Sequence, residues 1–180
     1  MGDGKRPDGD GKPAPQPQSM NEDQVRSLLR YIEETQDETV KAAVFRRLGE
    51  DCFRCRGLEE KVRRSAEDVA GFLDRINVQG TSKYWESLLF SEDKTVLTLT
   101  GRPVEICACA FAVGGHAPES LCAHCCKVFQ EHYFSTLFGE PVEVEITESF
   151  LYGSNRCNTL IRFLKRIRAM EAARETQGKG

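Results

Sequence analysis

Cysteines dominate the chemistry that this sequence could perform. Five of the eight cysteines and two of the three histidines lie in the run C-A-C-A-F-A-V-G-G-H-A-P-E-S-L-C-A-H-C-C, from Cys107 to Cys126. Cysteine is scarce in average globular chains, so this density calls for a chemical reason. Thiols offer three reasons, which are metal ligation, a set of disulfides, or redox chemistry.

The spacing divides these cysteines into two groups. Cys107 and Cys109 alternate along a predicted strand and share one of its faces, whereas Cys122, Cys125 and Cys126 open a predicted helix. A loop with two glycines joins the groups, so they can converge. Four sulfurs in two close pairs suit a tetrahedral Zn²⁺ ion or an iron–sulfur cluster, and a helix N-terminus stabilises thiolates. The sequence therefore predicts zinc or an iron–sulfur cluster on Cys107, Cys109, Cys122 and either Cys125 or Cys126.

Histidines extend the set of candidate ligands. His116 lies in the glycine-rich loop between the two cysteine groups and is a candidate metal ligand. His124 stands between Cys122 and Cys125, so we expect it to point away from a site that they share. His132 follows on the same helix and is expected at the surface or in the core.

Other interpretations of the thiols stay open. Free cysteines are often buried small hydrophobic residues, and this is the favoured interpretation for Cys157. The C-x-x-C pair Cys52 and Cys55 could complete the same site, bind a second metal, or pack against the sheet. Cys122 and Cys125 could instead form a dithiol–disulfide switch, although no parallel thioredoxin-type unit surrounds them.

Hydrophobic periodicity predicts the elements that must position the cysteines. Helical spacing prevails in the first half of the chain, and strand-like alternation begins near Lys94. The predicted fold class is α+β, with N-terminal helices packed on a small antiparallel sheet of two hairpins and a long intervening helix. Helices are predicted from Asn21, from Asp37, and over Leu58–Ile76, Pro118–Phe138 and Leu164–Arg174. A short amphipathic piece is predicted at Ser82–Phe90, with strands at Val96–Leu99, Val104–Phe111, Val142–Ile146 and Cys157–Phe163.

Composition bounds the protein class. The chain has 180 residues and a formal net charge of −3, which gives no reason to expect nucleic acid as a partner. No apolar run is long enough to span a membrane, and the N-terminus lacks the apolar region of a secretory signal. We therefore expect a cytoplasmic protein with reduced thiols. The expected organisation is a disordered tail at 1–19, one cysteine-rich domain at 20–164, and a basic helical tail at 165–180.

The C-terminal third resembles a known family. The run L-C-A-H-C-C-K-V-F-Q-E-H-Y-F-S-T-L-F-G-E-P-V-E-V-E-I-T-E-S-F-L-Y-G-S-N-R-C is similar to the 4-vinyl reductase domain, over about residues 120–163. The earlier helices and the C-x-C run resemble its cysteine-rich relatives, such as the methanogen output domain and thiazoline-carboxylate hydrolase-like proteins. The resemblance implies a TRAPP-like α+β fold that encloses a small hydrophobic ligand and often forms a dimer.

The resemblance also implies a zinc site made of cysteines and one glutamate. Cys122 and Cys157 match two of its ligand positions, which contradicts the interpretation of Cys157 as a core residue. Ser149 stands where a further cysteine is expected. Ile146 stands where the glutamate is expected, and Glu145 and Glu148 lie close by in the sequence. Any zinc site in this chain must therefore draw on Cys107, Cys109, Cys125 and Cys126.

Three functions follow as hypotheses. The first is a metal-containing domain that binds or senses a small ligand in an apolar pocket between helices and sheet, with output through a partner protein. The second is a small hydrolase or thiol-dependent catalyst, with a cysteine of the 122–126 run as nucleophile and His116 or His124 as base. The third is a structural zinc module for protein association.

Overall fold

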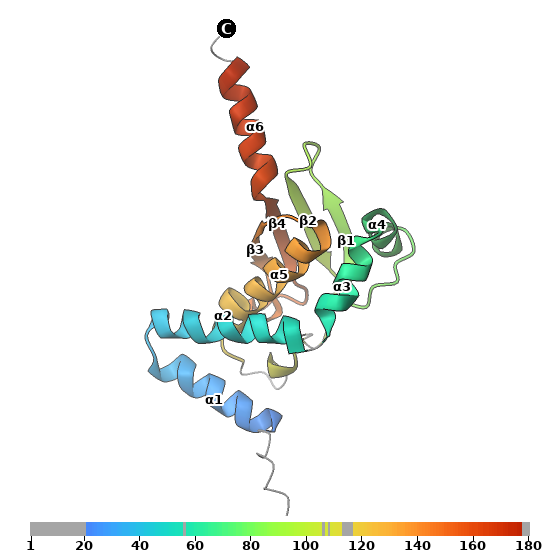
Figure 1. Ribbon diagram of the computed structural model, residues 1–180. Coiled ribbons are helices and arrows are strands. Elements are labelled where there is room, and N and C mark those ends of the chain that lie inside the picture. The colour runs from blue at the N-terminus through green and yellow to red at the C-terminus, as the bar shows by residue number, and fades with distance from the viewer. Residues whose placement is uncertain (1–20, 56, 106, 108, 113–116, 178–180) are drawn as a thin grey trace, which may run out of the picture.

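The computed structural model describes residues 21–55, 57–105, 107, 109–112 and 117–177. Helices come first, followed by a hairpin, a helix, a second hairpin and a last helix (Figure 1). The helices are α1 (Glu22–Thr35), α2 (Glu38–Cys55), α3 (Leu58–Ala66), α4 (Val69–Asn77), α5 (Lys127–Phe138) and α6 (Leu164–Gln177). The strands are β1 (Trp85–Phe90), β2 (Val96–Gly101), β3 (Val142–Glu148) and β4 (Asn158–Phe163). Shorter turns are the 3₁₀ helices η1 (Ala110–Ala112) and η3 (Phe150–Tyr152), and the π-helix η2 (Leu121–Cys126).

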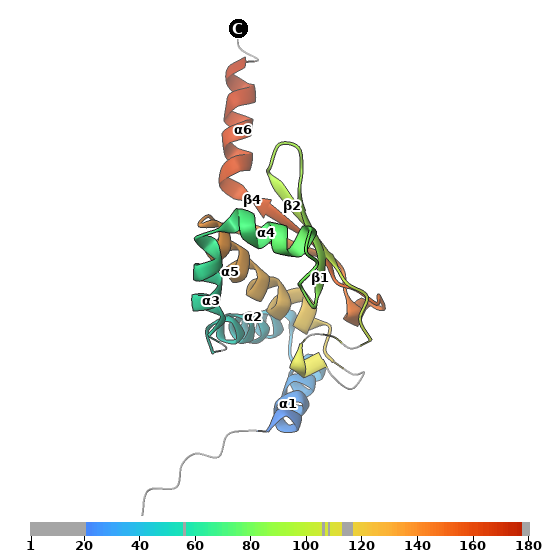
Figure 2. The same cartoon turned by 90° about the vertical axis from the view of Figure 1, so that its right-hand side faces the viewer.

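The four strands form one antiparallel sheet in the order β1-β2-β4-β3. Strand β3 therefore lies at an edge of the sheet. Its alternation is that of a half-buried strand, because Val142 and Val144 are buried while Glu143 and Glu145 are exposed. Helices α2 to α5 lie on one side of the sheet (Figure 2). The predicted α+β class, with two hairpins and a helix between them, is confirmed.

Aromatic side chains fill the space between α5 and the sheet. Phe134 of α5 is completely buried, with its ring centroid 5.9 Å from that of Trp85, 5.2 Å from Tyr133 and 6.4 Å from Phe138. The core around it includes Leu97 and Ile161 of the central strands. These aromatic rings therefore make α5 and the described part of the sheet one packed core.

A second, smaller core joins the N-terminal helices to the cysteine-rich segment. Leu29 of α1 and Phe45 of α2 pack with Leu121 and Cys125 of η2. Helix α1 begins with the predicted cap at Asn21, whose side chain accepts a hydrogen bond from the Gln24 N–H at 2.8 Å. The N-terminal helices therefore support the segment that carries Cys125.

Three predicted elements differ from those in the structure. The predicted strand at 104–111 does not form in its described residues, and the amphipathic piece at 82–90 instead supplies strand β1. Strand β2 pairs with β1 on one side and with β4 on the other, so it is not available for the predicted hairpin with 104–111. The single helix predicted over 58–76 is broken, since the Asp68 side chain accepts from the Gly71 N–H at 2.8 Å and starts α4 anew.

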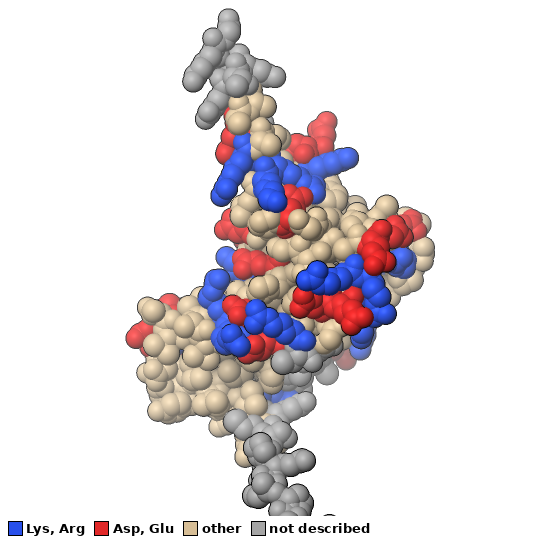
Figure 3. All heavy atoms as spheres, in the orientation of Figure 1, with Lys and Arg blue, Asp and Glu red and all other residues tan. Residues whose placement is uncertain are grey.

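Charged side chains of both signs are intermixed on the face shown in Figure 3. Several form short ion pairs within one helix, such as Arg63 with Glu59 at 2.8 Å and Arg47 with Asp51 at 3.0 Å. Within the described ranges, no helix is both long enough and apolar enough to cross a membrane. Residues 1–19 of the predicted tail, and residues 178–180, lie outside the described residues.

Candidate metal centre

The C-x-C segment is a loop and not a strand. A hydrogen bond from the Val104 N–H to the Asn155 carbonyl, 2.8 Å long, holds the start of this loop against the β3–β4 connection. The Cys109 N–H lies 3.5 Å from the Cys107 sulfur, and the Ala112 N–H donates to the Cys109 carbonyl at 3.0 Å. The loop therefore turns back on itself and keeps its two thiols close together.

The C-x-x-C-C run forms the π-helix η2 at the start of α5. Its first turn begins after Pro118, where the Leu121 N–H donates to the Pro118 carbonyl at 3.0 Å. The wider π turn is an uncommon conformation that occurs often at functional sites. Cys122 and Cys125 are buried, and Cys126 is half-buried.

The two cysteine groups converge. The thiol of Cys126 is in hydrogen-bond contact with the sulfur of Cys109 and with that of Cys122. Cys107 lies within electrostatic range of Cys109 and Cys122 as well. Sulfurs from the loop and from η2 thus meet in one cluster, although the loop is not the strand that we predict from the sequence.

The Cys122 thiol has the environment most favourable to a thiolate. Hydrogen bonds from the Cys126 thiol, the Ser149 hydroxyl and the Leu151 backbone N–H outweigh burial and lower the pKa of Cys122 to about 7. Ser149 is itself completely buried and also accepts a hydrogen bond from the Tyr152 N–H at 3.2 Å. The serine at the position where the resemblance expects a cysteine therefore lies directly at the cluster.

The neighbouring thiols are held in their protonated form. Burial, with smaller effects from nearby sulfurs, raises the pKa of Cys107 to about 11. The contact with Cys52 and then burial raise the pKa of Cys125, and contacts with Cys109 and Cys122 raise that of Cys126. A metal must therefore displace protons from these thiols when it binds.

A third segment reaches the cluster through α2. The Cys125 thiol is in hydrogen-bond contact with the sulfur of Cys52. One turn earlier on α2, Gly49 lies so close to η2 that a β-carbon there would be 2.4 Å from the Cys125 carbonyl oxygen. Because Gly49 has no side chain, the backbones of α2 and η2 can come into direct contact.

Replacing Gly49 with alanine tests this close approach. In an unhindered helix interior this change stabilises by about 0.5–1 kcal/mol. Here we expect a net loss of about 1–2 kcal/mol in the free energy of unfolding, because backbone atoms of η2 must move. Urea denaturation measures the difference in the free energy of unfolding between the variant and the wild type. A variant that is more stable than the wild type would show that α2 and η2 are not in backbone contact.

Cys157 lies immediately before β4 and is half-buried. The Phe150 backbone N–H hydrogen-bonds to its sulfur, but burial has the larger effect and raises the pKa of this thiol. Cys122 and Glu148 act on it electrostatically. Cys157 therefore lies beside the cluster, while Cys55 ends α2 with its side chain outside the described residues.

The described histidines are engaged elsewhere. His124 Nε2 lies 2.9 Å from the Glu38 carboxylate, which fixes the ring against the start of α2. The His132 ring stacks on that of Phe53, with centroids 5.9 Å apart. The predicted ligand His116 lies outside the described residues.

The thiols of the cluster contact one another and do not yet surround a common point. In the ranges that the structure describes, no group of three or more histidine, cysteine, aspartate or glutamate side chains is placed so that it could hold a metal ion. Sulfur–sulfur hydrogen bonds occupy the thiols instead. Metal binding requires these side chains to lose protons and turn toward a shared centre, and the donor set suits a thiophilic ion such as Zn²⁺.

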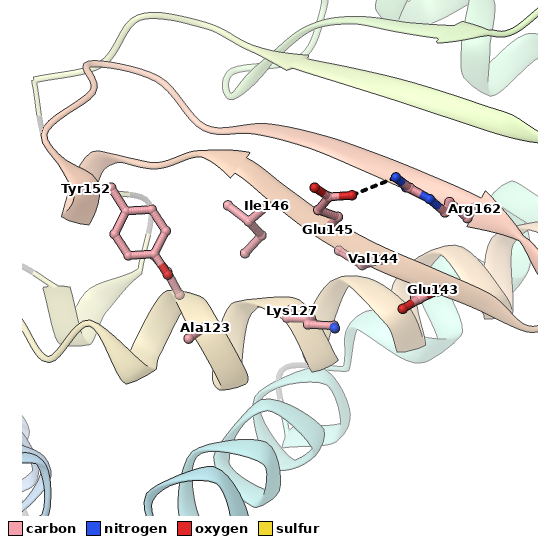
Figure 4. Close-up of a pocket in the computed structure, with 9 residues that line it drawn as sticks. Ala123, Lys127, Glu143, Val144, Glu145, Ile146, Tyr152 and Arg162 are labelled. Carbon is pink, nitrogen blue, oxygen red and sulfur yellow. Dashed lines mark hydrogen bonds and ion pairs between the residues drawn. The ribbon is translucent and has the colours of Figure 1, made fainter. Parts of the chain in front are cut away.

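A pocket of about 440 Å³ opens beside the cluster, between η2, the start of α5, and β3 (Figure 4). Cys122 lies in its wall together with Tyr152 of η3 and Ile146 of β3. Arg162 and Glu145 form a 2.7 Å ion pair at its rim, drawn as a dashed line in Figure 4. The remaining lining residues are Ala123, Lys127, Glu143 and Val144.

Comparisons with known proteins place the chain in no family. A scan against protein-family models finds no match, and a search of curated proteins finds none either. Among solved structures, the chain is similar to a trafficking protein particle complex subunit 3 from Naegleria fowleri, covalently bound to palmitic acid. The match has a TM-score of 0.35 and 11% identity, and covers 81% of this chain and 83% of that one. At this TM-score we draw no functional conclusion from it.

Proposed function

We propose that this chain is a metal-binding domain that binds a small ligand beside its metal and serves as a sensor. The thiolates of Cys107, Cys109, Cys122 and Cys126 would hold zinc or iron. The observation that supports this most is the contact of the Cys126 thiol with the sulfurs of both Cys109 and Cys122. A thiophilic metal needs thiols from separate segments that lie close enough to share it.

The protein supplies a partly prepared site. Ser149 and the Leu151 N–H orient Cys122 and stabilise its negative charge, as outer-shell groups do around metal-binding thiolates. A metal held by Cys107, Cys109, Cys122 and Cys126 would link the loop to η2. The pocket shares the wall that contains Cys122, so a ligand there lies next to a metal-binding side chain. Ligand binding and metal binding are therefore expected to influence one another.

Metal analysis tests this proposal. Protein purified without oxygen is expected to carry at least about one equivalent of zinc or iron per chain. A colourless sample indicates zinc, and a brown sample with charge-transfer absorption indicates an iron–sulfur cluster. Protein that has neither metal, and takes up neither when reconstituted under reducing conditions, would rule the proposal out.

A thiol-dependent catalyst is the second candidate. It is favoured by Cys122, whose pKa is lowered to about 7 mainly by the Cys126 contact, and which lines the pocket. In metal-free protein, this function predicts that Cys122 is alkylated by iodoacetamide much faster than the other cysteines at neutral pH. Mass spectrometry of the digested protein identifies the modified residue, and uniformly slow alkylation argues against a catalyst.

A structural zinc module differs from a sensor in that removal of its metal unfolds the domain. In that case a chelator is expected to abolish the far-ultraviolet circular dichroism of the domain. The core around Phe134 contains no cysteine, so we expect the helices and sheet to persist after chelation. A folded metal-free form that binds a small ligand favours the sensor.

A further inference from the structure

The pocket beside the cysteine cluster has two chemically different ends (Figure 4). Tyr152 and Ile146 lie at one end, where they offer an aromatic ring and an aliphatic side chain. Arg162 and its partner Glu145 lie at the other end. The volume of about 440 Å³ is that of a site for a small molecule. The lining therefore suits a small ligand with an apolar body and a polar or charged head.

The guanidinium of Arg162 lacks an acceptor. Its Nη2 atom donates to the Glu145 carboxylate at 2.7 Å, but its Nη1 atom is buried without a hydrogen-bond partner in the described part of the chain. A buried donor without an acceptor destabilises a protein, because it loses its hydrogen bonds to water. The Arg162 side chain as a whole is 35% exposed, so a rotation of the guanidinium turns Nη1 toward the pocket. A ligand oxygen there supplies the missing acceptor.

A second cation lies in the same lining. Lys127 is half-buried at the start of α5 and makes no ion pair with the residues that the structure describes. The lining also has two carboxylates, but Glu145 is already paired with Arg162, and Glu143 is exposed to water. The positive charge of Lys127 and the free donor of Arg162 are thus the less solvated groups, and both favour an anion.

We propose that the ligand of this pocket is a small organic carboxylate. Its carboxylate accepts a hydrogen bond from Arg162 Nη1 and lies in the field of Lys127, while its apolar body packs on Tyr152 and Ile146. A carboxylate matches the planar guanidinium, and its single charge is repelled less by the two glutamates of the lining than a phosphate dianion is. The inference rests on the proposed function, in which this pocket binds the ligand, and adds the chemical class of that ligand.

Three compounds with one body and different heads test the ligand class. Phenylpropionate, phenylpropionamide and phenylpropylamine are each titrated into the isotope-labelled full chain, and NMR chemical shifts report binding. We expect the carboxylate to bind at least about tenfold more tightly than the amide, with the amine weakest. The signals of Ile146 and Tyr152 are expected to shift. Equal affinities for carboxylate and amide, tighter binding of the amine, or no binding at millimolar concentrations overturns the inference.

A matched pair of arginine variants tests the assignment of Arg162. In Arg162→Met we expect the preference for the carboxylate over the amide to fall to about twofold or less. Arg156 pairs with Glu86 at 3.6 Å and is not part of the lining, so Arg156→Met is expected to keep the full preference. An unchanged preference in Arg162→Met overturns the assignment. If that variant fails to fold, the comparison of the three compounds on the wild type still decides the ligand class.

Metal content, measured on the same preparations, tests the proposed function separately. A chain that contains no zinc or iron but keeps the preference for the carboxylate contradicts the metal site and supports the ligand class. A metal-loaded chain without this preference contradicts the ligand class and leaves the metal site intact.

Discussion

Replacement of Cys122 with serine is expected to reduce bound metal to less than about a tenth of the wild-type content. Cys122 is the sulfur that contacts Cys126, accepts hydrogen bonds from Ser149 and Leu151, and lines the pocket. A serine hydroxyl is a poor ligand for a thiophilic ion, and it keeps its proton at neutral pH. Metal analysis of protein purified without oxygen measures the loss, and circular dichroism confirms that the variant is folded.

A graded control accompanies this variant. Ser149→Ala removes a hydrogen bond to Cys122 but no ligand, so we expect the metal affinity to fall by about 10–100-fold. Its metal content at saturating zinc is expected to equal that of the wild type. Competition with a zinc-binding dye measures the affinity. Retention of full metal content and affinity in Cys122→Ser would show that this thiol is not a ligand.

Truncation of Phe134 to alanine is expected to cause the largest loss of stability, about 3–5 kcal/mol in the free energy of unfolding. The ring is completely buried and contacts Trp85, Tyr133 and Phe138, so its removal leaves a cavity in the main core. Urea denaturation measures the change. The folded fraction is expected to keep its metal, because Phe134 belongs to a different core from Cys125.

An exposed aromatic residue provides the matched control. Tyr31 lies on α1 and is 60% exposed, so Tyr31→Ala removes a similar ring without opening a cavity. We expect this variant to lie within about 0.5 kcal/mol of the wild type. A similar loss for both variants would indicate that the core between α5 and the sheet is not packed as described.

Local patterns in the sequence predicted most of the fold. The alternation of valine and glutamate predicted β3, and the apolar repeats of the first two helices predicted α1 and α2. The pattern of the segment from Trp85 to Phe90 does not predict its structure, because a short apolar run suits a strand and a helix equally. Pairing with β2 makes this segment a strand. On the outer edge of β1, the Asn77 side chain accepts a hydrogen bond from the Leu88 N–H at 2.7 Å and donates one to the Leu88 carbonyl at 2.8 Å.

The sequence predicted that several cysteines lie close together, but it did not predict which cysteines contact one another. Spacing brought Cys109 and Cys122 together, as the structure does, although it assumed a strand where a loop exists. The contact of Cys52 with Cys125 depends on how α2 packs on η2, which local periodicity does not contain. Gly49 was the available signal, since a glycine inside a helix often marks a close backbone approach.

The position of β3 at the border of the sheet has a consequence for solubility. A strand with one open edge can pair with the same strand of another molecule and begin aggregation. In β3 the exposed residues Glu143, Glu145 and Glu148 recur along the strand, and Arg162 neutralises Glu145 alone. If two such strands met edge to edge, their glutamate carboxylates would lie opposite one another at close range. The glutamates therefore protect this edge against polymerisation, which the valines between them would otherwise favour.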